Sequence, residues 1–153
     1  MTDSTPLLAL DSVVLDLEAS SKKRIFEHIG ALFETHQGIA HHIVFDSLFA
    51  REKLGSTGLG RGIAIPHGRI KGIKDAQGVF MRLATPIPFD SPDGKPVQLL
   101  FALLVPEQAT ERHLQILSDV AERFSDNDFR DALMNAKTPT EIITLFTHPL
   151  KSK

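Results

Sequence analysis

Cysteine, tryptophan and tyrosine are all missing from this chain of 153 residues. The lack of cysteine excludes disulfides, a thiol nucleophile and zinc sites of the cysteine type, and it suits a reducing compartment. The chain also has no excess of basic residues, because its formal net charge is -2 with the histidines neutral. A general binder of nucleic acid needs a basic surface. We therefore expect no nucleic-acid partner.

Long apolar runs are missing as well. The longest, LLFALLV from Leu99 to Val105, is far shorter than the ~20 residues that span a bilayer. The N-terminal sequence MTDSTPLLAL has no basic segment before an apolar run, unlike a secretory signal. We expect a cytoplasmic protein without membrane insertion.

The residues that are present predict one α/β domain. Hydrophobic residues make up 42% and charged residues 24%, which is ordinary for a globular protein. Apolar spacing and end signals predict helices between residues 21 and 38, over 41–53, 110–124 and 128–135, and from a capping box at Thr138 onward. Strands are predicted at 12–17, 63–65, 77–84 and 97–105. The last strand lacks alternation, which predicts a central strand buried on both faces. Helices should therefore cover a sheet.

The segment GIAIPHGRI, residues 62–70, places a histidine directly after a short apolar strand and a proline. Pro66 fixes its own backbone angle and lacks a donor, and Gly68 leaves space beside the His67 ring. A neutral imidazole, roughly three quarters of the population at pH 7, is a nucleophile that could attack a phosphoryl group. The alternative is a surface histidine in an ordinary turn.

Two other residues could face the same group. His113 lies at the N-terminal end of its helix's apolar stripe, where the helix terminus disfavours an imidazolium and favours an anion. Its alternative role is a hydrogen-bonded histidine at the edge of the core. Arg51 ends the apolar stripe of an earlier helix, so it either stabilises that helix end or points at a phosphate. Spacing does not separate the two, nor does it give the direction of Arg61 and Arg69.

Other candidate sites have less support. The glycine-rich stretch Gly55 to Gly62 matches neither a P-loop nor the dinucleotide pattern, so a flexible turn is the simpler interpretation. The adjacent His41 and His42 point ~100° apart on a helix and rarely share an ion. A metal-dependent hydrolase using His67 and His113 would need a carboxylate ligand, and no H-E-x-x-H run exists. We expect no metal and no cofactor.

Two stretches carry a resemblance to a known family. The run REKLGSTGLGRGIAIPHGRI, Arg51 to Ile70, and HLQIL, His113 to Leu117, resemble enzyme IIA domains of the mannitol/fructose type. These domains belong to the bacterial phosphoenolpyruvate-dependent phosphotransferase system. The resemblance covers residues 8–150, and its block GxAIPHG after GSTG is specific. It implies a single α/β domain over 8–150, with a mixed β-sheet flanked by helices.

The resemblance also implies a function. His67 would accept a phosphoryl group on Nε2 from a histidine-phosphorylated carrier protein, without a cofactor. Arg51 and His113 would match the family residues beside the phosphate. With no attached membrane or carrier segment, the chain is most similar to the stand-alone nitrogen-regulatory form. That form would regulate nitrogen and potassium metabolism through transporters or sensor kinases.

Two other functions stay open. GIAIPHG also resembles fructose-specific domains, so the chain could be a sugar-transport component. It could also be a binding module that acts without phosphorylation. The sequence names neither a sugar nor a regulatory target.

Overall fold

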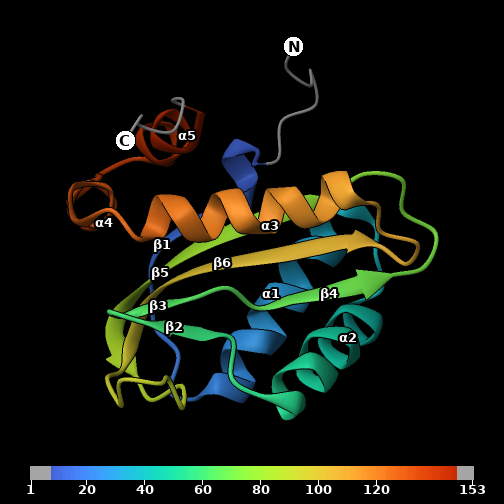
Figure 1. The fold of residues 1–153 in the computed structure, drawn as a ribbon, viewed down its shortest axis with the longest axis horizontal. Coiled ribbons are helices and arrows are strands. Elements are labelled where there is room, and N and C mark those ends of the chain that lie inside the picture. Colours follow the sequence, from blue (N-terminus) through green and yellow to red (C-terminus); the bar gives the residue numbers. More distant parts are fainter. Residues whose placement is uncertain (1–7, 148–153) are drawn as a thin grey trace.

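A six-stranded sheet organises residues 8–147, the part of the chain that the computed structural model describes (Figure 1). Its strands are β1 (Val13–Leu17), β2 (Gly58–Gly60), β3 (Ile63–Ala64), β4 (His67–Ile70), β5 (Gln77–Ile87) and β6 (Val97–Pro106). The order is β1-β5-β6-β3-β2, and β4 pairs with β6 beyond the end of β3. Parallel and antiparallel pairs both occur, so the expected mixed sheet is confirmed.

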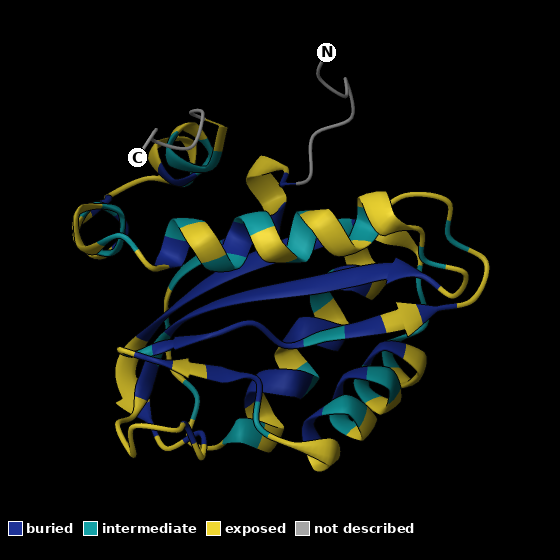
Figure 2. Cartoon of the chain, viewed as in Figure 1, coloured by how far each residue is buried: buried dark blue, intermediate teal, exposed yellow. Residues whose placement is uncertain are grey.

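Helices cover both faces of this sheet (Figure 1). They are α1 (Lys22–Gln37), α2 (His41–Leu54), α3 (Glu111–Phe124), α4 (Asn127–Asn135) and α5 (Pro139–Thr147), with a short 3-10 turn, η1, at Leu10–Ser12. One apolar cluster packs α1 and α2 against the sheet, and a second packs α3, α4 and α5 against the opposite face. Strand β6 lies between these clusters and is buried along almost its whole length, as predicted (Figure 2).

The helix ends follow their local sequence signals. The Ser21 hydroxyl accepts a hydrogen bond from the Arg24 N–H, and Gly38 ends α1 with a φ of 75°. At the start of α5, the Glu141 N–H donates to the Thr138 hydroxyl, and the Glu141 carboxylate accepts from the Thr138 N–H. This is the predicted capping box.

The region around His67 differs from the prediction. The strand predicted at 63–65 ends at Ala64, and His67 begins a second short strand instead of following one. Pro66 has no N–H, and the Ile65 N–H turns away from β6 to the Thr57 carbonyl. Pairing resumes where the Leu103 N–H donates to the Pro66 carbonyl at 2.9 Å.

Other boundaries moved less. Part of the glycine-rich stretch forms the edge strand β2, and β5 runs three residues beyond the predicted end at 84, to Ile87. The predicted domain boundary at residue 150 lies outside the described residues. Among the residues that are described, no helix is both long enough and apolar enough to cross a membrane.

Candidate active site

A pocket of ≈ 490 Å³ opens at the β4 edge of the sheet, between α2 and α3. It brings together His67, Arg51 and His113, the three residues singled out in the sequence. Its other lining side chains are mostly aliphatic: Ala50, Leu54, Leu103, Val105, Leu114 and Leu117, with Ser47, Gly68 and Arg69. The sequence motifs therefore meet in space, although Arg51 and His113 lie 62 positions apart in the chain.

The backbone fixes which nitrogen of His67 is nucleophilic. Nδ1 lies 2.8 Å from the carbonyl oxygen of Ile65. A carbonyl only accepts, so Nδ1 carries the proton and Nε2 keeps the lone pair. The Ile65 carbonyl precedes Pro66, and the break in strand pairing described above leaves it available to the ring. The geometry therefore leaves Nε2 as the nucleophilic nitrogen.

The surroundings also keep this ring uncharged. Burial lowers the pKa of His67 below the 6.5 of an ordinary histidine, and the positive charge of Arg51 lowers it further. The hydrogen bond to Ile65 and the negative charge of Glu52 act in the opposite direction, but burial is the largest effect. A neutral ring with a free Nε2 lone pair is the form that attacks an electrophile.

The position of Arg51 is compatible with both of the roles that spacing could not separate. Its Nη1 donates to the carbonyl of Gly55 at 2.7 Å, so the guanidinium satisfies a carbonyl at the C-terminal end of α2. The same side chain lines the His67 pocket and remains partly exposed. A guanidinium has five N–H donors, so this bond leaves others for an incoming anion.

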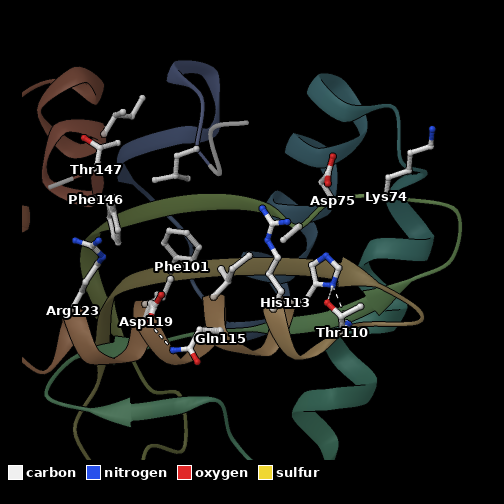
Figure 3. Close-up of a pocket in the computed structure, with 16 residues that line it drawn as sticks. Lys74, Asp75, Phe101, Thr110, His113, Gln115, Asp119, Arg123, Phe146 and Thr147 are labelled. Atoms are coloured by element: carbon white, nitrogen blue, oxygen red, sulfur yellow. Dashed lines mark hydrogen bonds between the residues drawn. The ribbon is translucent and has the colours of Figure 1, made fainter. Parts of the chain in front are cut away.

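His113 is held in the opposite tautomer to His67. It lies in the first turn of α3, and its Nδ1 accepts from the Thr110 N–H at 3.1 Å (Figure 3). A backbone N–H only donates, so Nδ1 is unprotonated and the proton lies on Nε2. His113 is therefore a neutral hydrogen-bond donor at the N-terminus of a helix, where an anion is favoured.

Gly68 allows α2 to pack closely against β4. A Cβ atom at this position would lie 2.3 Å from the Ser47 hydroxyl oxygen, far inside van der Waals contact. The Ser47 hydroxyl donates to the Arg69 carbonyl at 3.0 Å and joins the helix to the strand. Glycine therefore sets the spacing between the element that carries Arg51 and the one that carries His67.

Sequence reasoning missed the buried residue beside this site. Glu52, rather than Arg51, continues the apolar stripe of α2 into the interior, and only 7% of it is exposed. Its position four residues after Leu48 was the available signal, because residues four apart share a helix face. The Glu52 carboxylate accepts hydrogen bonds from Thr57 and forms an ion pair with Lys22.

The remaining sequence candidates are now placed. Arg69 is exposed and lines the pocket. Arg61 lies in the turn between β2 and β3, and its backbone N–H donates to the Asp93 carboxylate. None of residues 55–62, all of which the structure describes, lines this pocket. His41 Nε2 lies 3.0 Å from the Glu27 carbonyl, so that ring joins α2 to α1.

A larger pocket, of ≈ 830 Å³, also has His113 in its lining (Figure 3). It extends along α3, with Thr110 and His113 at one end and Arg123 and Phe146 at the other. Its floor includes buried Phe101. The volume is greater, but the smaller pocket contains His67, whose Nε2 lone pair is free, and we therefore take the smaller pocket as the candidate site.

The arrangement suits transfer of an anionic group. Nε2 of His67 has a lone pair, and the pocket also holds a guanidinium from Arg51 and an N–H donor on His113. Charge that develops on a phosphoryl group in transfer is stabilised by donors of this kind. Among the described residues, no group of three or more metal-ligating side chains was found.

Comparisons with known proteins identify the family of the chain. A sequence model of the family described as "Phosphoenolpyruvate-dependent sugar phosphotransferase system, EIIA 2" matches residues 6–148. The chain is 46% identical over 132 residues to a nitrogen regulatory protein of Klebsiella oxytoca, which covers 86% of this chain and 82% of that one.

Solved structures show the same fold. The crystal structure of nitrogen regulatory protein IIA-Ntr from Neisseria meningitidis is 52% identical and superposes with a TM-score of 0.88, over 92% of this chain and 97% of that chain. The crystal structure of IIA mannitol from Escherichia coli superposes with a TM-score of 0.77 over 92% of this chain and 99% of that one. Its identity is 20%, so this second likeness is one of fold alone.

Proposed function

Because the chain belongs to the EIIA 2 family of the phosphoenolpyruvate-dependent sugar phosphotransferase system, we propose that it carries a phosphoryl group on Nε2 of His67. The donor is a histidine-phosphorylated carrier protein, and residues 8–150 form the phosphotransferase unit. The observation that carries this proposal is the bond between His67 Nδ1 and the Ile65 carbonyl, which leaves Nε2 as the nucleophile.

The transfer is an exchange between two imidazoles. Nε2 of His67 attacks phosphorus in line with the departing ring, the new N–P bond forms, and the carrier's N–P bond breaks. The electron pair of the broken bond returns to the carrier's ring, which leaves as an imidazole. The Nδ1 proton of His67 stays on its nitrogen and remains bonded to the Ile65 carbonyl. No metal or cofactor enters this balance.

Arg51 and His113 stabilise the transferred group. The guanidinium of Arg51 neutralises charge on the equatorial oxygens, and the Nε2–H of His113 donates to one of them. Arg51 keeps its bond to Gly55 meanwhile, because the remaining guanidinium N–H groups reach the phosphoryl oxygens.

The rim of the pocket suits a docking protein. Leu54 is 85% exposed and Leu114 is 52% exposed, and both line the pocket with the cationic Arg51 and Arg69. Exposed aliphatic residues around a charged centre are typical of a protein-binding surface. The carrier protein therefore contacts the leucines while its phosphoryl group meets the arginines.

Phosphorylation then acts as a regulatory signal. It adds a charge of about -1.5 to -2 inside an apolar rim, so partners that pack on the leucines are expected to distinguish the two states. The names of the two relatives that are 46% and 52% identical favour nitrogen regulation. We propose transporters or sensor kinases as the targets and the cytoplasm as the location. A sugar-transport component is the alternative within the same family.

The test is label transfer from phosphoenolpyruvate through the first enzyme and the carrier protein. We expect acid-labile phosphate on the wild-type chain and none on His67→Ala. His42→Ala serves as a matched control, because His42 is an exposed histidine on α2. Labelling of His67→Ala at the wild-type level would refute the assignment.

A second comparison separates signalling from simple binding. Partners captured from cell extract by wild type, His67→Ala and the charge mimic His67→Glu are compared. A regulator should lose or gain partners in His67→Glu relative to His67→Ala. Identical sets of partners would favour a binding module that ignores phosphorylation.

A further inference from the structure

We propose that Glu52 and Thr57 form a buried junction that positions both the His67 ring and the Arg51 guanidinium. Phosphoryl transfer depends on this junction, although neither of its two residues lines the His67 pocket. The expected change in rate rests on the proposed function, whereas the expected change in ring orientation rests on geometry alone. Glu52 and Thr57 are thus positioning residues.

The Glu52 carboxylate is fully committed to its neighbours. Its side chain is 4% exposed, and it accepts from the Thr57 hydroxyl at 2.6 Å and from the Thr57 N–H at 3.1 Å. Lys22 Nζ lies 2.9 Å from its other oxygen. A buried carboxylate is tolerated only when it is paired and hydrogen-bonded in this way. Thr57 is consequently held in place by two hydrogen bonds, which its N–H and its hydroxyl donate to one charged carboxylate.

One branch of contacts leads from Thr57 to the nucleophile. The Thr57 carbonyl accepts from the Ile65 N–H at 3.0 Å, and the Ile65 carbonyl bonds Nδ1 of His67 at 2.8 Å. Pro66 stiffens the backbone between Ile65 and His67. A displacement of Thr57 would therefore move the carbonyl that sets the tautomer and direction of His67.

The other branch leads to the guanidinium. Gly55 lies two residues before Thr57, and its carbonyl accepts from Arg51 Nη1 at 2.7 Å. Between them, the Ser56 hydroxyl donates to the Phe89 carbonyl at 2.7 Å and holds the loop against the 88–92 region. The same short loop thus places a partner for each of the two reacting-site side chains.

The least disruptive test removes only the Thr57 hydroxyl. Thr57→Val keeps the side-chain shape and the backbone N–H, and loses the 2.6 Å bond to Glu52. Because small misplacements of reacting groups are costly, we expect kcat for phosphoryl uptake to fall about 10-fold. KM for the carrier protein should stay unchanged, because docking uses the leucine rim. Thr57→Ser, which retains the hydroxyl, should recover most of the rate.

Ring NMR supplies a readout that does not need phosphoryl transfer. Ring nitrogen shifts of His67 in the wild type should show the single tautomer with the proton on Nδ1. In Thr57→Val they should show a mixture of tautomers, because Thr57 keeps only its backbone bonds to Glu52 and therefore holds the Ile65 peptide less firmly. Glu52→Gln should also change the ring nitrogen shifts of His67 toward a mixture of tautomers. Glu18→Gln and Thr35→Val, at exposed positions, are the matched controls and should leave both readouts unchanged.

The outcomes are separable. A wild-type rate and an unchanged His67 spectrum in Thr57→Val would overturn the junction, even if the variant were less stable. A rate loss in Thr57→Val that Thr57→Ser does not recover would also overturn it. A wild-type chain that takes up no label would refute the proposed function, while the ring spectra would still decide whether the junction orients His67.

Discussion

Replacing His113 by glutamine and by glutamate tests whether this residue donates a hydrogen bond into the pocket or only caps helix α3. His113 occupies the third position of α3, and its Nδ1 accepts from the Thr110 N–H at 3.1 Å. Glutamine and glutamate make this same bond in capping boxes, so either replacement keeps the start of the helix. Only glutamine also retains an N–H that can donate into the pocket.

The size of the expected effect follows from that difference. Loss of one donor to a developing negative charge costs about 10²–10³ in rate, or roughly 2.7–4 kcal/mol. His113→Glu loses the Nε2–H and adds a carboxylate that repels the phosphoryl group. We therefore expect its rate of phosphoryl uptake to fall at least ~10²-fold, and that of His113→Gln to stay within ~10-fold of wild type.

The assay is the initial rate of label transfer from the phosphorylated carrier, together with a thermal melt. Far-UV circular dichroism is the suitable probe of unfolding, because the chain has no tryptophan or tyrosine for intrinsic fluorescence. Similar melts with very different rates would support a donor role. Equal rate losses in the two variants would show that His113 acts only as a cap, and the reasoning above would fail.

Two further predictions concern packing and pH. Gly68→Ala should lower the free energy of unfolding by about 2 kcal/mol, since its Cβ would overpack against the Ser47 hydroxyl. Adding Ser47→Ala should recover about 1 kcal/mol in a urea titration, and strictly additive losses would contradict this packing. Because burial lowers the pKa of His67, phosphoryl uptake should persist below pH 6.5, which a rate profile and an NMR titration check. Between pH 6.5 and the lowered pKa of His67 in the folded chain, the unfolded chain binds more protons than the folded one. The free energy of unfolding should therefore decrease as the pH is lowered through this range, and His67→Gln should abolish that part of the pH dependence.

Local signals explain why most helices could be predicted. A side-chain cap at Ser21, a glycine at position 38 and the capping box at Thr138 each act within one turn of helix, and each has the predicted effect. The apolar run of β6 likewise identified a strand buried on both faces. Such features depend on neighbours in the sequence, so one sequence suffices to read them.

The two short strands beside His67 could not be read in this way. Strands β3 and β4 both pair with β6, which begins 27 residues after the end of β4, so their pairing depends on distant residues. Spacing does not decide whether Arg51 or Glu52 ends the apolar stripe of α2, because the positions three and four residues after Leu48 lie on the same helix face. The burial of Glu52 and its contact with Thr57 show that Glu52, and not Arg51, turns inward.

The tautomers of the two histidines depend on tertiary structure as well. His67 Nδ1 meets a carbonyl, which accepts, whereas His113 Nδ1 meets an N–H, which donates. Backbone groups do not titrate, so the fold assigns opposite roles to two chemically identical rings for as long as both stay neutral. Both rings line the pocket, one with a lone pair on Nε2 and the other with a proton on Nε2. A substitution elsewhere that displaced the Ile65 carbonyl or the Thr110 N–H would therefore disrupt the proposed pairing of nucleophile and donor. It would do so without changing His67 or His113 themselves.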